Sequence, residues 1–332
     1  MRKIALFSLL AFLLLSGCSR KEYFKPSSNE ISGAINPTSI GDKLTTANGD
    51  VATFKSGNAV DKKNRLKKNT LSNTESIIAI DGEMVALSGL DGEFKIIKNN
   101  KIIYERRFKS KVVAASMQND DLALITAQNI IYLIKIPQNS IISFHKIADV
   151  YAQDARVKAP IFLEDIVVYP TLDGKIYLID RRYGGIIRTM HISSEPFFNN
   201  IIFLDIDEDS IYAATGTKLM QISQKRTKVI DGDIKIVLKD KNFIYALMTN
   251  GEIRRFDRNL NLLNSAKFDF AIFTNATIKD GNLYVLEKMG YLIKLDSLLQ
   301  NYQIYKIGGK IKDKTFSTDR SFYIGSKKIE IE

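Results

Sequence analysis

The residue with the clearest chemical signature in this 332-residue chain is Cys18, its only cysteine. It follows Leu15-Ser16-Gly17 at the end of an apolar run, Ile4–Leu15, which is itself preceded by Arg2 and Lys3. A basic start, a short apolar run and a small-residue cut site are typical of a secretory signal peptide. The run has about a dozen residues and is too short to cross a bilayer as a helix. A thiol at such a site is a nucleophile at a membrane surface, where it can be alkylated.

The sequence around Cys18, Leu-Ser-Gly-Cys, resembles the lipobox of bacterial lipoproteins. The resemblance implies that residues 1–17 are removed and that Cys18 becomes a lipid-modified first residue, palmitate included. Several acyl chains, at about 0.8 kcal/mol per buried methylene, give stable anchoring. Ser19 stands where an Asp would favour the inner membrane under the enteric sorting rule. We therefore expect a protein anchored in the outer membrane and facing the periplasm.

The rest of the chain offers little catalytic chemistry. A single cysteine permits no internal disulfide, and neither His145 nor His191 has a second histidine or cysteine at ligand spacing. The acidic run Asp205–Asp209 lacks the glycine and glutamate positions of an EF-hand calcium loop. No nucleophile elbow or phosphate loop is present. We expect no enzyme activity, no metal, and no cofactor other than the covalent lipid on Cys18.

The chain is basic, with a formal net charge of +11, or 11 − 2 = +9 once Arg2 and Lys3 are removed. Export argues against nucleic acid as the partner. The charge favours an anionic membrane surface or an acidic protein face, although it is also compatible with solvated lysines alone. The run DKKNRLKK over residues 61–68 holds five basic residues in eight, and is more typical of a solvated loop than of a binding site.

The part of the chain after the signal peptide divides into two regions of different composition. Residues 18–45 are rich in Ser, Asn, Pro and Lys without a sustained period, which predicts a lipid-anchored flexible tether. From about residue 75 onward, short apolar runs alternate with tight turns, and no amphipathic helix longer than two turns is visible. This pattern predicts an all-β domain, which we place at residues 46–332.

A tight turn between two apolar runs recurs every 34 to 45 residues. The turns are Asp91-Gly92, Gln128-Asn129, Asp173-Gly174, Gly216-Thr217, Asn250-Gly251, Met289-Gly290 and Gly325-Ser326. Asp-Gly and Asn-Gly favour the turns that join antiparallel strands. A period near 40 with about four short strands per unit predicts the four-stranded antiparallel blades of a β-propeller.

The period also predicts the number of blades. Six complete blades are expected to begin near residues 75, 110, 156, 198, 234 and 272. The last unit has room for only three strands, so an N-terminal strand near Val51 to Lys55 is expected to close the ring. This makes seven blades, or eight if residues 31–70 contain further strands.

The best-defined unit contains Asp173-Gly174-Lys-Ile-Tyr-Leu-Ile-Asp180, followed by Gly184-Gly185, and resembles the pyrroloquinoline-quinone-type propeller repeat. Two families share that repeat. The quinone-dependent dehydrogenases need tryptophan against the cofactor, and this chain has none. The other family, the BamB-like lipoprotein propellers, needs only a lipobox, a tether and a propeller without catalytic residues.

The BamB-like resemblance implies a monomeric, non-catalytic scaffold for outer-membrane protein assembly and insertion in the Bam complex. Its expected partners are the barrel-assembly outer-membrane protein and the substrates of that protein. Two alternatives remain open. One is a ligand-binding or quinoprotein-like propeller using its central channel, which a channel filled with apolar side chains would exclude. The other is a general envelope-integrity lipoprotein.

Five residues are candidates for protein binding. Arg156 precedes Ala159-Pro160, and an arginine shortly before Ala-Pro is a feature of a partner-binding loop in the BamB-like family. Arg181 and Arg182 follow a strand end, where solvation competes with pairing to an acidic partner. Phe197 and Phe198 are adjacent and point to opposite faces if they lie in a strand, so one of them is an interface candidate unless both are buried between blades.

Overall fold

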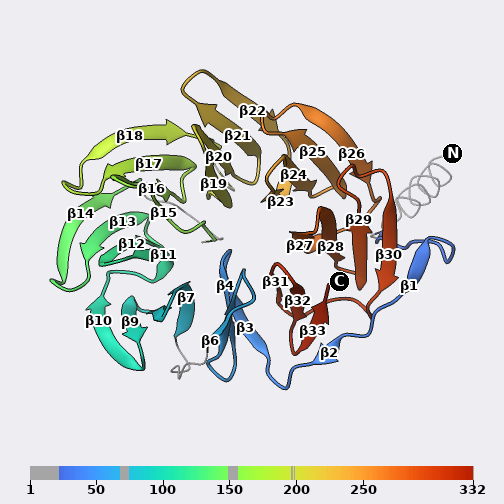
Figure 1. The fold of residues 1–332 in the computed structure, drawn as a ribbon, viewed down its shortest axis with the longest axis horizontal. Helices are drawn as coiled ribbons and strands as arrows, with labels where there is room; N and C mark the ends of the chain where they lie inside the picture. The colour runs from blue at the N-terminus through green and yellow to red at the C-terminus, as the bar shows by residue number, and fades with distance from the viewer. Residues whose placement is uncertain (1–21, 68–74, 149–155, 196, 198, 332) are drawn as a thin grey trace, which may run out of the picture.

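The chain forms eight small β-sheets arranged in a ring around a central axis, which is an eight-bladed β-propeller (Figure 1). The computed structural model describes residues 22–67, 75–148, 156–195, 197 and 199–331. Seven blades have four strands and one has five. No helix in this described part of the chain is long and apolar enough to cross a bilayer.

Blades are numbered along the chain, and their strands are given in the order in which they pair. The first four blades are β3 (Leu44–Ala47), β4 (Val51–Phe54), β5 (Ala59–Asp61), β6 (Leu66–Lys67); β7 (Ser76–Asp81), β8 (Met84–Ser88), β9 (Glu93–Lys98), β10 (Lys101–Arg107); β11 (Val112–Gln118), β12 (Asp121–Thr126), β13 (Ile130–Lys135), β14 (Ser140–Lys146); and β15 (Ile161–Phe162), β16 (Ile166–Pro170), β17 (Lys175–Asp180), β18 (Ile186–His191).

The other four blades include the two strands from the N-terminal segment. They are β19 (Phe203–Asp207), β20 (Ser210–Ala214), β21 (Lys218–Ser223), β22 (Thr227–Asp231); β23 (Ile234–Lys239), β24 (Phe243–Met248), β25 (Glu252–Asp257), β26 (Leu262–Lys267); β27 (Phe273–Lys279), β28 (Asn282–Glu287), β29 (Tyr291–Leu295), β30 (Tyr302–Lys306), β1 (Ile31–Ala34); and β31 (Thr315–Ser317), β32 (Ser321–Ile324), β33 (Lys327–Glu330), β2 (Thr38–Ser39).

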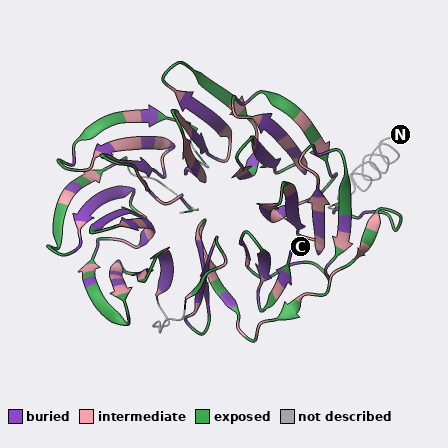
Figure 2. Cartoon of the chain, viewed as in Figure 1, coloured by how far each residue is buried: buried purple, intermediate pink, exposed green. Residues whose placement is uncertain are grey.

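Burial within a blade depends on the distance of the strand from the axis (Figure 2). The six residues of β12 are all buried, because both faces of this strand are covered by neighbouring blades. The outer strand of the same blade, β14, alternates between exposed and more buried positions along much of its length. This is why the sequence shows continuous apolar runs rather than strict alternation at the inner positions.

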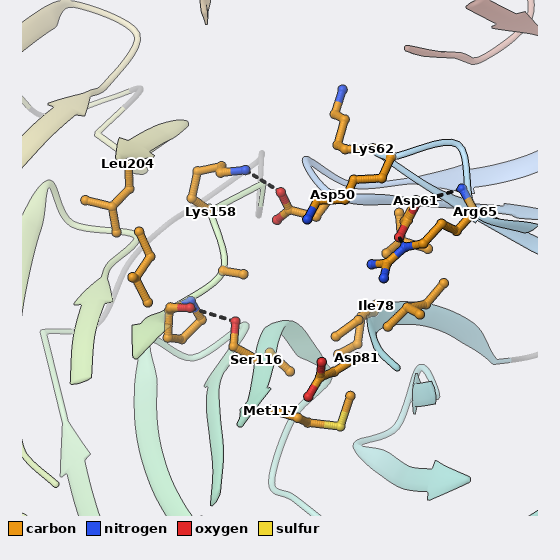
Figure 3. A pocket seen from close by; sticks show the side chains of 18 residues that line it. Asp50, Asp61, Lys62, Arg65, Ile78, Asp81, Ser116, Met117, Lys158 and Leu204 are labelled. Carbon is orange, nitrogen blue, oxygen red and sulfur yellow. Dashed lines mark hydrogen bonds and ion pairs between the residues drawn. The ribbon is translucent and has the colours of Figure 1, made fainter. Parts of the chain in front are cut away.

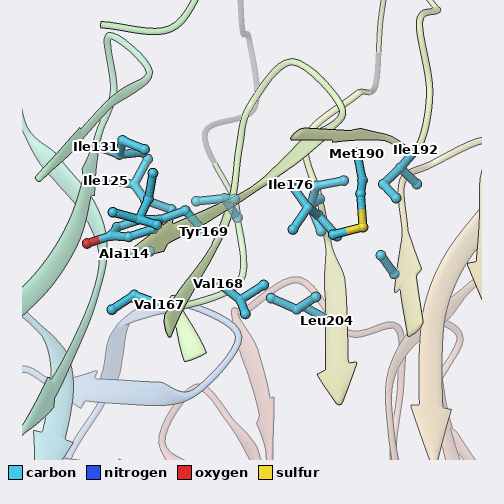
Figure 4. Packing of buried hydrophobic residues seen from close by; sticks show 14 of the residues in the cluster. Ala114, Ile125, Ile131, Val167, Val168, Tyr169, Ile176, Met190, Ile192 and Leu204 are labelled. Carbon is cyan, nitrogen blue, oxygen red and sulfur yellow. The ribbon is translucent and has the colours of Figure 1, made fainter. Parts of the chain in front are cut away.

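Neighbouring blades are held together by shared apolar clusters. In the cluster between the third and fourth blades, Tyr169 is fully buried and packs in the same group as Ile125 and Val167 (Figure 4). The Tyr169 hydroxyl donates to the carbonyl of Tyr132 in the third blade at 2.7 Å. Full burial of a large apolar side chain contributes about 1.5–3 kcal/mol, so these seams stabilise the ring.

In several blades, a backbone hydrogen bond links the turn between the second and third strands to the residue that follows the fourth strand. In the sixth blade the Phe268 amide donates to the Gly251 carbonyl at 2.9 Å. Gly251 has a φ of +84°, and a Cβ at this position would lie 2.2 Å from the Phe268 carbonyl oxygen. The same amide-to-turn hydrogen bond occurs at Gly92, Gly174 and Gly290. Glycine is therefore required by both the backbone conformation and the close approach.

The structure confirms the all-β propeller with four-stranded antiparallel blades. All seven predicted turns lie between the second and third strands of seven different blades, and the last unit supplies three strands. Eight blades are present, the larger of the two numbers that the sequence left open. The additional blade is β3–β6, whose strands have only two to four residues and include many small or polar side chains.

The strand that closes the ring differs from the one predicted. Val51–Phe54 is β4 of the first blade, and the eighth blade is completed instead by Thr38–Ser39, which pairs with β33 in antiparallel fashion. A strand at this position contributes mainly backbone hydrogen bonds, which side-chain types do not reveal. Closure by an N-terminal strand is therefore confirmed, but the strand lies earlier in the chain than predicted.

The prediction of a flexible tether over residues 18–45 is wrong for much of its length. β1 and β2 lie within it and belong to the seventh and eighth blades. Phe24 is buried, and its ring centroid lies 6.1 Å from that of Phe268 and 5.6 Å from that of Tyr291. The propeller therefore begins well before residue 46. Cys18 lies outside the described residues.

We expect Gly251→Ala to destabilise the propeller more than Gly281→Ala does. Gly281 also has a positive φ, +74°, but a Cβ there would meet nothing within 4 Å. The backbone conformation alone costs about 1–3 kcal/mol, and Gly251→Ala adds the clash with the Phe268 carbonyl. Thermal and urea unfolding followed by circular dichroism would measure the difference. Equal losses for the two variants would show that the close approach is not important.

Candidate functional site

The central channel contains a cavity of about 950 Å³ whose charged side chains are predominantly basic. Among the described residues, six basic side chains and two carboxylates line it: Lys62, Arg156, Lys158, Lys235, Lys239, Lys314, Asp205 and Asp233. They come from several blades and from the connection that precedes β15. A channel filled with apolar side chains would have excluded ligand binding there. The structure does not show such a channel, so this alternative stays open.

A second cavity of about 360 Å³ is adjacent to the first, and Lys62, Lys158 and Leu204 line both (Figure 3). The Lys158 ammonium forms an ion pair with the Asp50 carboxylate. Burial alone would raise the pKa of Asp50, but this ammonium and its hydrogen bond hold the pKa below its usual value. In Figure 3 the nitrogen of Lys62 is directed away from this pair.

Lys62 has a different environment from Lys158. Its ammonium donates to the Ser317 carbonyl at 2.8 Å and to the Ser317 hydroxyl at 3.0 Å, and lies 4.6 Å from the centroid of the Phe316 ring. Among the described residues no carboxylate lies within ion-pair distance of it. Burial and the charge of Lys158 lower the pKa of Lys62 to about 8, while Asp50 acts in the opposite direction. The channel thus holds a cation bound to neutral oxygen atoms.

Arg156 and Phe197 lie on adjacent connections. The Asn200 side-chain amide donates to the Arg156 carbonyl, and the exposed Arg156 side chain contributes to the wall of the central cavity. Phe197 is 69% exposed in the connection between β18 and β19, three residues before Asn200. Phe198 lies outside the described residues. The structure therefore places Arg156 at the channel and leaves Phe197 available for contact.

Arg181 and Arg182 lie at the other end of β17 from the Phe197 connection, about 17–20 Å away along the strand. Arg181 crosses to the third blade, where its Nε lies 2.6 Å from the Asp121 carboxylate and a terminal nitrogen donates to Gln118 at 2.8 Å. Arg182 is exposed and 3.4 Å from Asp165. Arg181 thus has a partner within the chain, and its role in protein binding stays a prediction, as does that of Arg182.

The other polar motifs also have intramolecular partners. Lys239 pairs with Asp205 at 2.7 Å and with Asp207 at 3.0 Å, and Arg258 pairs with Asp207 and Glu208. These two cations pair with three of the four acidic residues in the run. His145 contacts the Gly184 carbonyl at 3.0 Å across a blade seam. The described residues contain no group of three or more His, Cys, Asp or Glu side chains that could hold a metal ion.

A second candidate surface is the outer rim. Ten of the eighteen large apolar side chains that are exposed in the described residues lie on the outer strands β10, β14, β18, β22, β26 and β30: Ile102, Ile103, Ile141, Phe144, Ile186, Ile187, Val229, Leu262, Leu263 and Tyr302. In the described part of the chain, the first five of these strands pair on one side only. An unpaired strand edge that carries apolar side chains is suited to binding another extended segment.

The sixth of these outer strands shows how such an edge is used. β1 pairs with β30 in parallel, with Ile31 opposite Ile304 and Ala34 opposite Lys306. The chain thereby adds a fifth strand to its own seventh blade. The remaining outer strands have the same position in their blades and lack this cover (Figure 1).

Sequence reasoning missed both surfaces. The run DKKNRLKK contains Lys62, which we expected to be part of a solvated loop, and its five basic residues were the available signal. The available signal for the rim was the pair of apolar residues at or next to the start of three outer strands: Ile102-Ile103, Ile186-Ile187 and Leu262-Leu263.

No family model matches the chain. Its sequence is similar to the plasminogen-binding protein PgbB of Helicobacter pylori. Identity is 28% with the protein of strain J99, over 96% of this chain and 68% of that protein, and 27% with the protein of strain 26695, over 96% and 67%. This similarity spans nearly all of the present chain.

The fold is similar to that of several solved propellers. BamB from Moraxella catarrhalis superposes with a TM-score of 0.67 at 14% identity, covering 94% of this chain and 99% of that one. The C-terminal WD40 domain of Sif2 gives 0.66 at 11% identity, over 90% and 99%, and the designed Ika8 protein gives 0.61 at 12%, over 91% and 100%. The likeness shows a BamB-like propeller fold and nothing about function.

We expect Arg181→Ala to destabilise the chain and Arg182→Ala to leave it nearly unchanged. Asp121 is almost fully buried, so losing one of its two cationic partners, Arg181 and Lys135, is expected to cost about 2–4 kcal/mol. The exposed Arg182 pair should contribute less than about 0.5 kcal/mol. Urea unfolding of both variants checks this. Similar midpoints for the two would contradict an inter-blade role for Arg181.

Proposed function

We propose that this protein is a non-catalytic, protein-binding scaffold, held by lipid on Cys18 at the periplasmic side of the outer membrane. Its partners are the barrel-assembly outer-membrane protein and the unfolded barrel precursors. The observation that carries the proposal is the set of one-sided outer strands with exposed apolar side chains. Precursor strands are extended and alternate apolar with polar residues, so they can pair with such edges by strand addition.

The N-terminal contacts suit a short anchor. Six residue steps separate Cys18 from the buried Phe24. Fully extended, they span at most about 22 Å. A propeller anchored at Cys18 therefore stays next to the bilayer, with its seventh blade nearest to the attachment point. With the proposed anchor, the rim would lie where precursors reach the outer membrane.

We expect Cys18→Ala to release the protein from the membrane. The variant lacks the thiol that accepts lipid, and the described domain has no helix long and apolar enough to cross a bilayer. Membrane fractionation and mass spectrometry of the mature N-terminus would measure the change. Ser19→Ala, which keeps the cysteine, serves as the control. Membrane retention of Cys18→Ala equal to that of the control would disprove lipid anchoring at this residue.

The scaffold function is tested by affinity purification of the full chain from detergent-solubilised membranes. We expect wild type to recover the barrel-assembly protein, and Ile186→Lys/Ile187→Lys to recover at least five-fold less, because two charges would disfavour strand addition at β18. Leu90→Lys is the matched control, since Leu90 is 62% exposed but lies in a turn. Reproducible recovery without any barrel-assembly component would reject the proposed partner.

The similarity to PgbB supports a second partner, plasminogen. It covers 96% of this chain, so it includes the propeller as well as the N-terminal segment. Surface plasmon resonance with immobilised plasminogen tests it directly. Saturable binding of the full chain, together with failure to recover barrel-assembly components, would favour plasminogen over the assembly role.

A further inference from the structure

We propose that the central channel is a second binding site, which receives a carboxylate-rich segment of a partner protein between Lys62, Lys158 and Lys314. This site is separate from the outer strand edges, so the inference does not require strand addition to occur. The ligand chemistry follows from the charges on the channel wall, from the way the lysines are held, and from the size of the space.

The charge on the wall is uneven. The larger cavity has six basic side chains and two carboxylates among the described residues that line it. Asp205 is engaged by Lys239, and Lys158 is engaged by Asp50 from the adjoining cavity. Two further lysines donate to neutral oxygen atoms in the hydrogen bonds that the structure shows: Lys62 to Ser317 and Lys314 to the Thr45 carbonyl. Among the described residues, this wall therefore carries more basic than acidic side chains.

The position of Lys62 is set by the backbone rather than by a flexible loop. Its amide donates to the Asp50 carbonyl at 3.1 Å, and its carbonyl accepts from the Asp319 amide at 2.8 Å. The first contact lies within the first blade and the second reaches the eighth. A cation fixed in this way loses little conformational entropy when it binds an anion.

A carboxylate is expected to bind more strongly to these lysines than to lysines on the outer surface. Hydrogen bonds between an ammonium and a carboxylate are roughly twice as strong as those between neutral groups, and a concave, partly desolvated wall strengthens them. The net charge of the chain would also attract an acidic segment before contact. Both effects favour a ligand that carries several negative charges.

The size of the space favours a peptide over a small anion. The larger cavity, about 950 Å³, is near the upper end of the range of small-molecule pockets, and the second, about 360 Å³, adds space next to it. Their basic residues are spread over the first, sixth and eighth blades and the connection before β15. Carboxylates spaced along an extended segment can reach several of these residues, whereas one small anion cannot.

The test measures binding of a fluorescein-labelled hexapeptide of alternating Asp and Glu to the full mature chain in detergent, by fluorescence anisotropy. The Asn/Gln hexapeptide is the neutral counterpart. We expect the acidic peptide to bind, the neutral one not to bind, and Lys62→Gln to weaken binding at least ten-fold. Lys101→Gln, which removes an exposed lysine on β10, should leave the affinity unchanged.

Protonation of Lys62 provides a further readout. The ammonium contacts Ser317 and the Phe316 ring, the charges of Lys158 and Asp50 also act on it, and its pKa is about 8. Affinity for the acidic peptide should therefore fall between pH 7 and pH 9.5, as the ammonium loses its proton. Lys62→Arg keeps its charge over this range, so it should restore binding at pH 9.5.

Several results would overturn the proposal. They are equal binding of the neutral peptide, unchanged affinity in Lys62→Gln, and succinate binding as tightly as the hexapeptide, which would indicate a small-anion site. If Lys62→Gln does not fold by circular dichroism, Lys314→Gln replaces it, because Lys314 lines the larger cavity from the eighth blade. An unchanged affinity in that folded variant would equally reject the site.

Discussion

Closure of the ring is the constraint on which the rest of this structure depends. The inner strands carry long apolar runs that are buried only when each blade has a neighbour on both sides. The chain meets this requirement at the seam of the first and eighth blades, where Leu44 and Phe54 pack with Phe316 and Tyr323. β2 completes the eighth blade by pairing with β33. Without that seam, two apolar blade faces would be exposed to solvent.

The same seam organises the channel. Lys62 lies between the first and eighth blades, and its backbone bonds to both. Its ammonium is directed to Ser317 and Phe316 of the eighth blade. The contact that closes the ring therefore also places a desolvated cation on the channel wall. Ring closure and the candidate binding site therefore share residues.

The two candidate surfaces differ in chemistry. The outer rim presents apolar side chains and unpaired backbone groups, which suit extended segments, whereas the channel presents lysines, which suit carboxylates. β1 on β30 demonstrates that an outer edge of this propeller accepts an added strand. The likeness to BamB concerns the fold alone, and the similarity to the plasminogen-binding protein PgbB spans nearly all of the chain. Both are compatible with a propeller that presents loops and edges to other proteins.

Much of the architecture could be predicted from the sequence by itself. Asp91-Gly92, Asp173-Gly174 and Asn250-Gly251 mark turns whose φ and close approach only glycine permits, so their spacing determined the blade period. Such turns can be recognised from the residue types alone, because their conformation depends on one or two neighbouring residues. The first blade and the strands β1 and β2 were not predictable in this way, because short segments of small and polar residues are held by pairing with distant strands.

The candidate sites also divide into those that the sequence predicts and those that only the tertiary structure reveals. Sequence by itself determined Cys18 as the candidate anchor, since a processing signal is a local motif. Only the tertiary structure decided that Arg181 is engaged by Asp121 and that Lys62 lines the channel beside Lys158. The residues in these two pairs are 60 and 96 positions apart in the chain. Their geometry depends on how whole blades pack around the axis, which no local pattern of residue types encodes.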